Sequence, residues 1–323
     1  MIQKENSLAV IPPEQNPPFP TTPLDIPQQR PGKSRRMKLL EQQGCFHFGT
    51  KSITIQRATT ADDLLAAYNL VHDTFQEEGR SFPHPTPQRM RIFQALPNTA
   101  TFVAKNQNAT VAVVSVVEDT PGLGLPSDNT CGQEIQALRR SASRICQIAN
   151  LSIAPAFRRT AVLTELLRCC FAHLQAISCQ QAITTFKPGH QAFYELMGFE
   201  TIGTYLHDTD PNQTPTLLAN LNLQKLFKII DNVKFGENSD LATLKHYYLD
   251  SNPYLIQIED WIAEAQQAFA NAVFLRRLFV EMTNILVDST PDELLVIREF
   301  WGENAWLDAL GHTIIFDVFS PFY

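Results

Sequence analysis

Two arginines, Arg158 and Arg159, follow the end of an apolar strand near the middle of the chain. The strand is expected over residues 145–153, Pro155 breaks it, and a helix is expected from residue 162. The first turn of a helix leaves backbone N–H groups free and carries the positive end of the helix dipole, so it attracts anions. The arginines add charge-assisted donors. This segment indicates a site for a phosphate-bearing ligand, although arginines near a helix start are more often simply solvated.

A second segment follows the next expected strand, over residues 181–186. Its run Phe193-Tyr194-Glu195, completed by Gly198 and Phe199, resembles the signature of the GNAT (N-acetyltransferase) superfamily. The resemblance implies an α/β (α+β) fold with a mixed, mostly antiparallel seven-stranded sheet that is splayed at its central strands. It also implies that a thioester carrier lies in the resulting cleft, with its phosphates on the helix that follows the first of these strands.

Within that superfamily the chain resembles the N-acyl amino acid synthases, which are related to the autoinducer (acyl-homoserine-lactone) synthases. Residues 55–64, residues 148–158 and the motif of Pro188, His190 and Phe193-Tyr194 carry this resemblance. It implies an enzyme that moves a long acyl chain from acyl-carrier protein to the amine of an amino acid or a similar small amine. It implies no tightly bound cofactor, only an acyl-phosphopantetheine thioester as the donor substrate.

One departure from the superfamily pattern bears on the donor. Ala161 and Leu163 stand where users of acetyl-CoA resemble a glycine-rich pyrophosphate loop. A leucine side chain obstructs the close backbone approach that glycine permits. A carrier protein presents a phosphopantetheine arm with one phosphate, so the loop of an enzyme that uses this donor need not be rich in glycine. We therefore expect acyl-carrier protein rather than acyl-CoA, with acetyl-CoA-dependent N-acetyl transfer as the alternative.

The resemblance assigns roles to three residues. Backbone N–H groups near Leu151 and Ile153 would pair with the pantetheine or with the thioester oxygen, as donors that stabilise an oxyanion. Tyr194 matches the tyrosine that lies near the sulfur and protonates the leaving thiolate. A tyrosine at this position could instead pack in the core.

The general base is the open question. The related synthases commonly place a glutamate on the central strand, and this chain has Gln147 there. An amide cannot act as a base, although it could orient a water molecule or the amine. His84 and His190 are candidates, because histidine is the usual side chain for proton transfer near neutral pH, and Glu118, at the end of an expected strand, is another candidate. A catalytically inactive module that binds an acyl carrier or a lipid is the remaining alternative.

Arginines gather around the same strand and helix, within residues 139–168, where Glu165 is the single acidic residue of the sequence. Such a cluster would steer an acidic carrier protein toward the site, unless the side chains point in different directions. The cluster consists of Arg139, Arg140, Arg144, Arg158, Arg159 and Arg168.

Alternating and helical patterns predict the elements that position these residues. Their order is β-α-α-β-β-(α)-β-α-β-α-β-β, over residues 51–223. Residues 1–50 are proline-rich with a basic end, so we expect a disordered tail, with contact to an anionic membrane or an acidic partner as the minority interpretation. Residues 224–323 are expected to be helical, with one long amphipathic helix over 258–286. That region is either a second unit or an elaboration packed on the first.

Composition limits the class of protein. The chain has 323 residues, a net charge of −7, 44% hydrophobic and 18% charged residues, which is typical of a globular protein. The acidic balance argues against a nucleic-acid partner. No apolar run is long enough to span a membrane, and no secretory signal is evident. The six cysteines form no zinc pattern, so we expect no metal and a cytoplasmic protein with reduced thiols.

Overall fold

The computed structural model describes residues 32–46, 53–77, 90–206, 215–234 and 236–311. These residues lie in one compact unit, Gly32–Tyr323. Within the described ranges, no helix is both long enough and apolar enough to cross a lipid bilayer.

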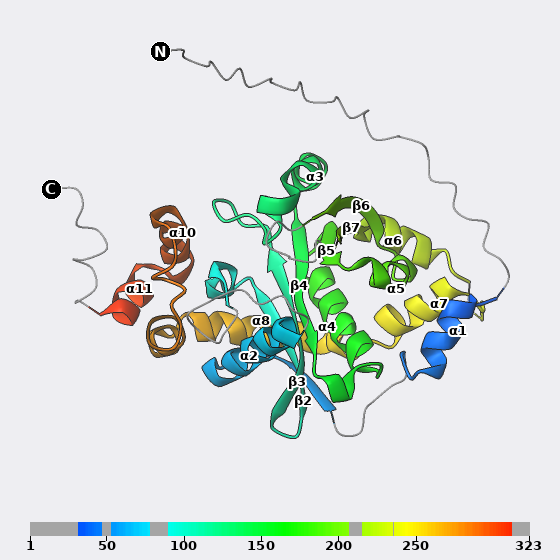
Figure 1. The fold of residues 1–323 in the computed structure, drawn as a ribbon, viewed down its shortest axis with the longest axis horizontal. Coiled ribbons are helices and arrows are strands. Elements are labelled where there is room, and N and C mark those ends of the chain that lie inside the picture. Colours follow the sequence, from blue (N-terminus) through cyan, green and yellow to red (C-terminus); the bar gives the residue numbers. More distant parts are fainter. Residues whose placement is uncertain (1–31, 47–52, 78–89, 207–214, 235, 312–323) are drawn as a thin grey trace, which may run out of the picture. The chain divides into compact units, whose positions relative to one another are not determined.

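A seven-stranded sheet organises the described part of the chain (Figure 1). Its order is β1-β2-β3-β4-β5-β7-β6, and the pairing is antiparallel except between β4 and β5, which run parallel. The sheet, its splayed centre and the helical C-terminal region confirm the predicted GNAT fold. The strands are β1 Ile53–Arg57, β2 Ala100–Asn106, β3 Ala109–Glu118, β4 Ile145–Ile153, β5 Gln181–Phe186, β6 Glu200–Tyr205 and β7 Thr216–Asn222.

The two faces of the sheet carry different helices because strand side chains alternate between faces. Ala112, Val114 and Val116 of β3 pack in the core with α4 (Val162–Ala176), whereas Val113 packs in the core with α2 (Ala61–Glu77) and Val117 in the core with α3 (Asp128–Ser141). Helix α4 is buried almost all round, since α8 (Tyr254–Phe269) covers the side turned away from the sheet. Short helix α5 (Gln191–Leu196) follows β5 and the 3-10 turn Pro188–His190.

The C-terminal region completes both cores instead of forming its own. Its first half, with α6 (Leu223–Asp231), α7 (Asp240–Lys245) and α8, joins the core around α4. Its second half, with α9 (Ala272–Leu275), α10 (Pro291–Trp301) and α11 (Glu303–Leu310), joins the core around α2 (Figure 1). Trp301 donates from Nε1 to the carbonyl of Ala95, 2.7 Å away.

Two expectations from the sequence need correction. Helix α1 (Arg35–Gln42) lies inside the segment expected to be a disordered tail, because Met37 is fully buried in the core around α4 and Ser34 caps the helix. The single long helix expected over 258–286 ends at Phe269, because the Asn271 side chain accepts from the backbone of residues 273 and 274 and starts a new helix. The remainder of the expected tail lies outside the described residues.

Candidate active site

The central strands separate part of the way along their length. β4 and β5 pair from Ile145 with Gln181 as far as Ile148 with Thr184. β4 continues to Ile153 and β5 to Phe186. The splay therefore begins beside Ile148 and Thr184, and it opens toward the starts of the helices that follow the two strands.

A β-bulge lies on β4 just past the point of separation. Ser115 pairs with Ala149, but Val113 pairs with Ser152, so β4 advances three residues while β3 advances two. Asn150 occupies the extra position with φ of +56°, a backbone conformation that asparagine tolerates better than most residues. A bulge leaves one residue out of the ladder and re-aims its neighbours. Leu151 and Ile153 follow it, both half-buried, so their predicted role as backbone donors is compatible with this geometry.

The two arginines at the start of α4 have different surroundings. Arg158 donates from Nε to the Ile153 carbonyl at 3.0 Å, and its Nη2 lies 2.9 Å from the Glu77 carboxylate of α2. Its charge is thus partly compensated, and the side chain fixes the turn after β4. Arg159 is exposed and has φ of +61°. Of the two, Arg159 is the more accessible to a phosphate.

The loop residues that replace glycines are packed. Ala161 is buried at the N-cap of α4, and Leu163 is half-buried against the core around that helix. The Thr160 hydroxyl accepts from the backbone N–H of Val162 at 3.3 Å, just before the first turn. The Leu163 side chain therefore adds to the core and narrows the space at the first turn of α4.

Tyr194 lies beside the point where the strands separate. Its ring stacks on Phe186 with centroids 4.1 Å apart and planes 7° apart. Burial raises the pKa of the phenol to about 12, and a hydrogen bond with the Thr184 side chain partly offsets this. Thr184 in turn donates to the Ile148 carbonyl at 3.0 Å. The phenol is thus protonated at neutral pH and is held next to the splay, as a general acid requires.

Gln147 has a different environment from the one its predicted role needs. Its Oε1 accepts from the Ser127 backbone N–H at 3.0 Å, and its Nε2 donates to the Ser127 hydroxyl at 2.7 Å. Both ends of the amide therefore hold the segment before α3. Gln147 also precedes Asn150 by three residues, roughly 10 Å along the strand. The geometry gives no support to a role in orienting the amine.

The candidate bases are not gathered at the splay. His190 is exposed at the N-cap of α5, and His84 lies outside the described residues. Burial raises the pKa of Glu118, and the nearby charges of Arg144 and Arg57 lower it. Glu118 pairs with Cys146, four residues before the bulge, so it lies roughly 13 Å along the strand from Asn150.

A buried polar cluster at the bulge went unrecognised in the sequence. The Tyr68 hydroxyl of α2 is hydrogen-bonded to Thr101 at 2.9 Å and to Ser115 at 3.0 Å. Asn150 donates from Nδ2 to the Ser115 hydroxyl at 3.4 Å, and burial raises the pKa of Tyr68. The polar partners of Tyr68 come from β2 and β3, which no local signal in the sequence connects to α2.

The predicted arginine cluster does not form one surface. Arg168 is 1% exposed and is ion-paired with Glu165 at 2.9 Å. Arg139 is ion-paired with Asp119 at 2.5 Å and with Asp128 at 2.6 Å. These two arginines serve the fold, because an arginine in contact with carboxylates stabilises the elements that carry them. Within the described ranges, no group of three or more His, Cys, Asp or Glu side chains could hold a metal ion.

Comparison with solved structures returns related folds at low identity. FeeM, an N-acyl amino acid synthase from uncultured soil microbes, is 18% identical, with a TM-score of 0.47 over 54% of this chain and 92% of that one. A GNAT family acetyltransferase from Elizabethkingia anophelis with acetyl-CoA bound is 18% identical, with a TM-score of 0.34 over 54% and 100%. An acyl-CoA N-acyltransferase from Pseudomonas aeruginosa is 14% identical, with a TM-score of 0.35 over 53% and 99%.

Comparison of sequences is more selective. No curated protein matches the chain. The model of one family, described as N-acyl amino acid synthase FeeM, matches residues 66–222. The matched span runs from α2 to the end of β7 and so contains the bulge, the start of α4 and Tyr194. Residues 66–222 thus match the FeeM family of N-acyl amino acid synthases, a family of acyltransferases.

Proposed function

We propose that this protein transfers a long-chain acyl group from the thioester of acyl-carrier protein to the amine of an amino acid. The observation that carries the proposal is the splay of β4 and β5 inside the segment that matches the FeeM family, with a bulge on one strand and a protonated tyrosine beside the other. The match to this family supports a thioester donor and an amino acid acceptor. The carrier and the length of the chain are our inference.

In the proposed reaction the thioester lies in the splay. Backbone N–H groups at Leu151 and Ile153 donate to the carbonyl oxygen and stabilise the negative charge that develops there. The amine attacks the carbonyl carbon, the C–N bond forms and the C–S bond breaks. The phenol of Tyr194 gives its proton to the departing thiolate, and the proton that the nitrogen loses as the amide forms returns the phenolate to its neutral form. We infer that neither His190 nor Glu118 removes the proton of the amine, because His190 is exposed at the N-cap of α5 and Glu118 pairs with Cys146, four residues before the bulge.

The start of α4 supports a carrier protein over free coenzyme A. Arg159 offers one accessible cation, enough for the single phosphate of a phosphopantetheine arm. Leu163 and Ala161 fill space that glycines would leave open. Replacing both by glycine should therefore raise the rate with an acyl-CoA relative to the rate with the acyl-carrier protein. An unchanged ratio of the two rates would contradict the inference that Ala161 and Leu163 favour the carrier protein over coenzyme A.

Helix α1 supports the same partner, because it borders the mouth of the splay. Arg36 donates to the Ala192 carbonyl in the first turn of α5 at 2.9 Å. Phe46, just past α1, donates from its backbone to Thr164 in the first turn of α4 at 3.4 Å. Arg35 and Lys38 are exposed on this helix. Their charge complements an acidic carrier protein and would speed its association.

Charge reversal on α1 tests that contact. Lys38→Glu should raise the KM for acyl-carrier protein about threefold to tenfold at low salt, and the effect should shrink as salt screens the charges. The matched control is Lys228→Glu, which reverses an exposed charge on α6. A small acyl-pantetheine thioester should be used equally well by both variants. Equal KM values for the carrier protein in both variants would remove α1 from the docking surface.

The donor itself is tested by competition. The protein is incubated with long-chain acyl-carrier protein, acetyl-CoA and a mixture of amino acids, and products are read by mass spectrometry. We expect long-chain N-acyl amino acids. N-acetyl amino acids alone would support the acetyltransferase alternative, and no product from either donor would support an inactive binding module. We also propose a reducing, cytoplasmic location, which the six free, buried cysteines support.

A further inference from the structure

Three buried hydroxyl groups meet on the face of the sheet that carries α2. The Tyr68 hydroxyl lies 2.9 Å from the Thr101 hydroxyl and 3.0 Å from the Ser115 hydroxyl, and the latter two are 3.2 Å apart. Each hydroxyl donates one proton and accepts through two lone pairs, so the three form a closed hydroxyl ring in which every proton has an acceptor. The three residues are at most 2% exposed, and their hydroxyls therefore depend on one another rather than on water.

The hydroxyl ring is joined to the bulge on β4 through Asn150. Asn150 donates from Nδ2 to the Ser115 hydroxyl at 3.4 Å, which uses the lone pair of Ser115 that the hydroxyl ring leaves free. The Tyr68 hydroxyl also lies within hydrogen-bonding reach of the Asn150 side chain. Buried polar groups weaken a core unless all of them are paired, and a fully paired network fixes one arrangement. The network therefore holds the Asn150 side chain in one orientation.

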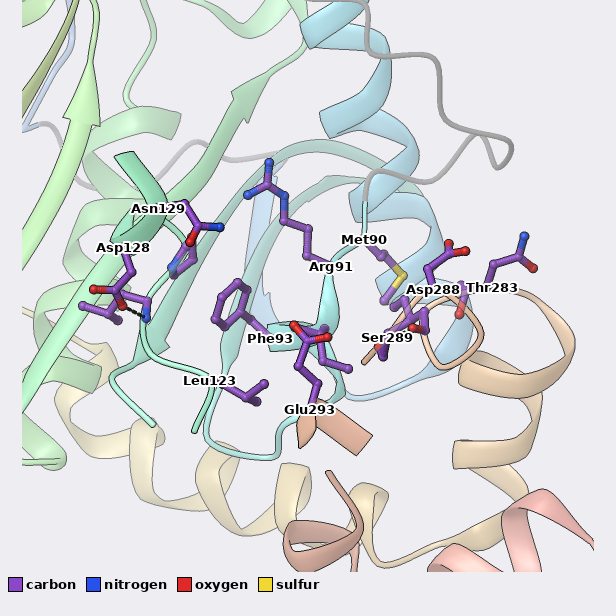
Figure 2. Close-up of a pocket in the computed structure, with 15 residues that line it drawn as sticks. Met90, Arg91, Phe93, Leu123, Asp128, Asn129, Thr283, Asp288, Ser289 and Glu293 are labelled. Carbon is purple, nitrogen blue, oxygen red and sulfur yellow. Dashed lines mark hydrogen bonds between the residues drawn. The ribbon is translucent and has the colours of Figure 1, made fainter. Parts of the chain in front are cut away.

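A cavity on the same face of the sheet does not reach the hydroxyl ring. Buried Gln94 lies within hydrogen-bonding reach of the Tyr68 hydroxyl. The adjoining segment, residues 90–93, lines a cavity of about 380 Å³ together with residues 123–129 and 283–293 (Figure 2). Among the described residues that line this cavity, none belongs to the hydroxyl ring. Any effect of the hydroxyl ring on the splay is thus exerted through Asn150 rather than by contact with a ligand.

Asn150 in turn fixes the direction of the Leu151 N–H. The peptide unit that carries this N–H is planar, so its orientation follows from the backbone dihedral angles of Asn150. The φ of Asn150, +56°, is left-handed, a conformation that a residue other than glycine keeps only where its surroundings hold it. The hydrogen bond from Asn150 to Ser115 is such a restraint.

The N–H groups that follow the bulge are directed into the splay. Ala154, just past β4, donates its backbone N–H to the Val111 carbonyl of β3 at 2.9 Å. Successive N–H groups of a strand point toward opposite edges, so the N–H of Ile153 points away from β3, and that of Leu151 does likewise. On that side β5 has separated from β4, which leaves this edge of β4 open to a thioester oxygen.

We propose that Tyr68 is a positioning residue for acyl transfer: through Ser115 and Asn150 it aims the Leu151 N–H at the oxygen of the thioester. This inference rests on the proposed function. A donor stabilises the developing oxyanion only at hydrogen-bonding distance from it, about 2.7–3.1 Å, and a misplacement of about 1 Å costs about 100-fold in rate. Loss of the Tyr68 hydroxyl should therefore slow the chemical step and leave donor binding unchanged.

Removal of single hydroxyl groups tests the role of Tyr68. Tyr68→Phe keeps the buried aromatic ring, and the hydroxyls of Thr101 and Ser115 stay paired with each other. It should lower kcat with long-chain acyl-carrier protein about 10- to 100-fold and leave the KM for this donor unchanged. The control is Tyr248→Phe, which removes the hydroxyl of another buried tyrosine, bonded to the sulfur of Met197, and should match the unmodified protein. Equal kcat values in the two variants would overturn the proposal.

A double-mutant cycle tests whether Tyr68 acts through Asn150. Asn150→Gly keeps the left-handed conformation available and removes the side chain that the hydroxyl ring holds. In an Asn150→Gly background, Tyr68→Phe should therefore cause no further loss of kcat. If the two losses multiply instead, Tyr68 acts by another route and the proposal is wrong.

A bound ketone reports the position of the Leu151 N–H without any turnover. The probe is palmitoyl-pantetheine phosphate in which a methylene group replaces the sulfur and the carbonyl carbon is isotope-labelled. Hydrogen bonds lower the stretching frequency of a carbonyl group. The infrared band should therefore lie at higher frequency in Tyr68→Phe and Asn150→Gly than in Tyr248→Phe and the unmodified protein. A purely structural role would lower only the midpoint of urea denaturation, and Asn150→Gly keeps the test decisive if Tyr68→Phe fails to fold.

The same measurement separates this inference from the function on which it rests. If the unmodified protein forms no acyl product but the bands differ as expected, the function fails and the role of Tyr68 stands. If product forms and the bands coincide, the function stands and the role of Tyr68 fails.

Discussion

At the scale of single residues, Tyr194 combines the two properties of a general acid. Its pKa of about 12 keeps the phenol protonated, and its contact with Thr184 places it at the splay. The stacked ring of Phe186 would hold a phenylalanine equally well. Loss of the hydroxyl therefore affects chemistry more than packing.

We expect Tyr194→Phe to lower kcat about 100-fold or more, since a general acid contributes about 10²–10⁴ in rate. The control is Tyr248→Phe, another buried tyrosine, whose hydroxyl faces the sulfur of Met197. Single-turnover rates with acyl-carrier protein measure the effect. Because Tyr194 stays protonated below pH 12, the rate of the unmodified protein should rise as the amine deprotonates and show no alkaline loss below pH 10. A rate in Tyr194→Phe within twofold of the control would remove the residue from the mechanism.

Asn150 offers a second test at this scale, because its backbone is left-handed. Asn150→Gly removes the contact with Ser115, and glycine adopts the left-handed conformation without strain. Asn150→Ala removes the same contact, but the left-handed conformation costs an alanine about 1–2 kcal/mol. Denaturation in urea should therefore find Asn150→Ala less stable than Asn150→Gly by about 1 kcal/mol. The opposite order would mean that the bulge does not impose this conformation.

Prediction from sequence succeeded at this scale where a motif is local. The run from Phe193 to Phe199 identifies the superfamily without any structure. The surroundings of Gln147 and Arg168 could not be predicted, because the partner of each lies far along the chain: Ser127 for Gln147 and the C-terminal region for Arg168.

At the scale of elements, α4 shows how far local patterns reach. The helix expected from residue 162 begins at Val162. The break at Asn271 was missed because the apolar spacing continues through it, and capping by one side chain outweighs that spacing.

His173 on α4 makes the stability of this element sensitive to acid. Its ring is 2% exposed, and neither ring nitrogen has a hydrogen-bond partner among the described residues. Burial lowers its pKa to about 3, with a smaller contribution from the charge of Arg57. The unfolded chain takes up a proton near pH 6.5 and the folded chain near pH 3. Stability is thus unaffected above pH 7 and falls as the pH drops from 6.5 toward 3.

Between pH 7.5 and pH 4.5 this histidine should cost roughly 2–3 kcal/mol of unfolding free energy. His173→Leu should remove that loss and leave the protein more resistant to acid, while His190→Gln, at an exposed position, should change nothing. Urea denaturation at several pH values measures both variants. Parallel pH curves for His173→Leu and the unmodified protein would show that the buried ring is not responsible.

At the scale of the whole molecule, buried polar contacts join the part that matches the family to the part that follows it. Arg168 of α4 donates from Nε to the Tyr247 carbonyl at 2.9 Å, and its guanidinium lies 4.1 Å from the centre of the Tyr247 ring. Tyr254 donates to the Glu165 carboxylate at 3.0 Å, and Tyr247 donates to its other oxygen. The boundary near residue 223 thus marks the end of the family resemblance, while the core continues across it.

This arrangement explains why the sequence left the role of residues 224–323 open. The pattern of an amphipathic helix indicates that one face is buried, but it does not identify the element against which that face packs. Arg168 and Glu165 form the contact between the two regions. A local pattern assigns these charged residues to a solvated helix face, but tyrosines of the C-terminal region cover them. Because a buried ion pair depends on all its hydrogen-bond partners, the two regions should unfold together.

A double-mutant cycle tests that coupling. Arg168→Met should cost about 3–5 kcal/mol of unfolding free energy, because it leaves the Glu165 carboxylate buried without its cation. Glu165→Gln in the same chain removes the stranded charge, so the double variant should be more stable than Arg168→Met alone. Fluorescence of Trp301 and Trp306, which lie in the core around α2, reports on the second half of the C-terminal region when it is measured in a Trp261→Phe background, because Trp261 packs against the core around α4. If the regions are coupled, this fluorescence and the circular dichroism of the whole chain should report the same transition in every variant. Two separate transitions, or strictly additive losses in the double variant, would contradict a shared core.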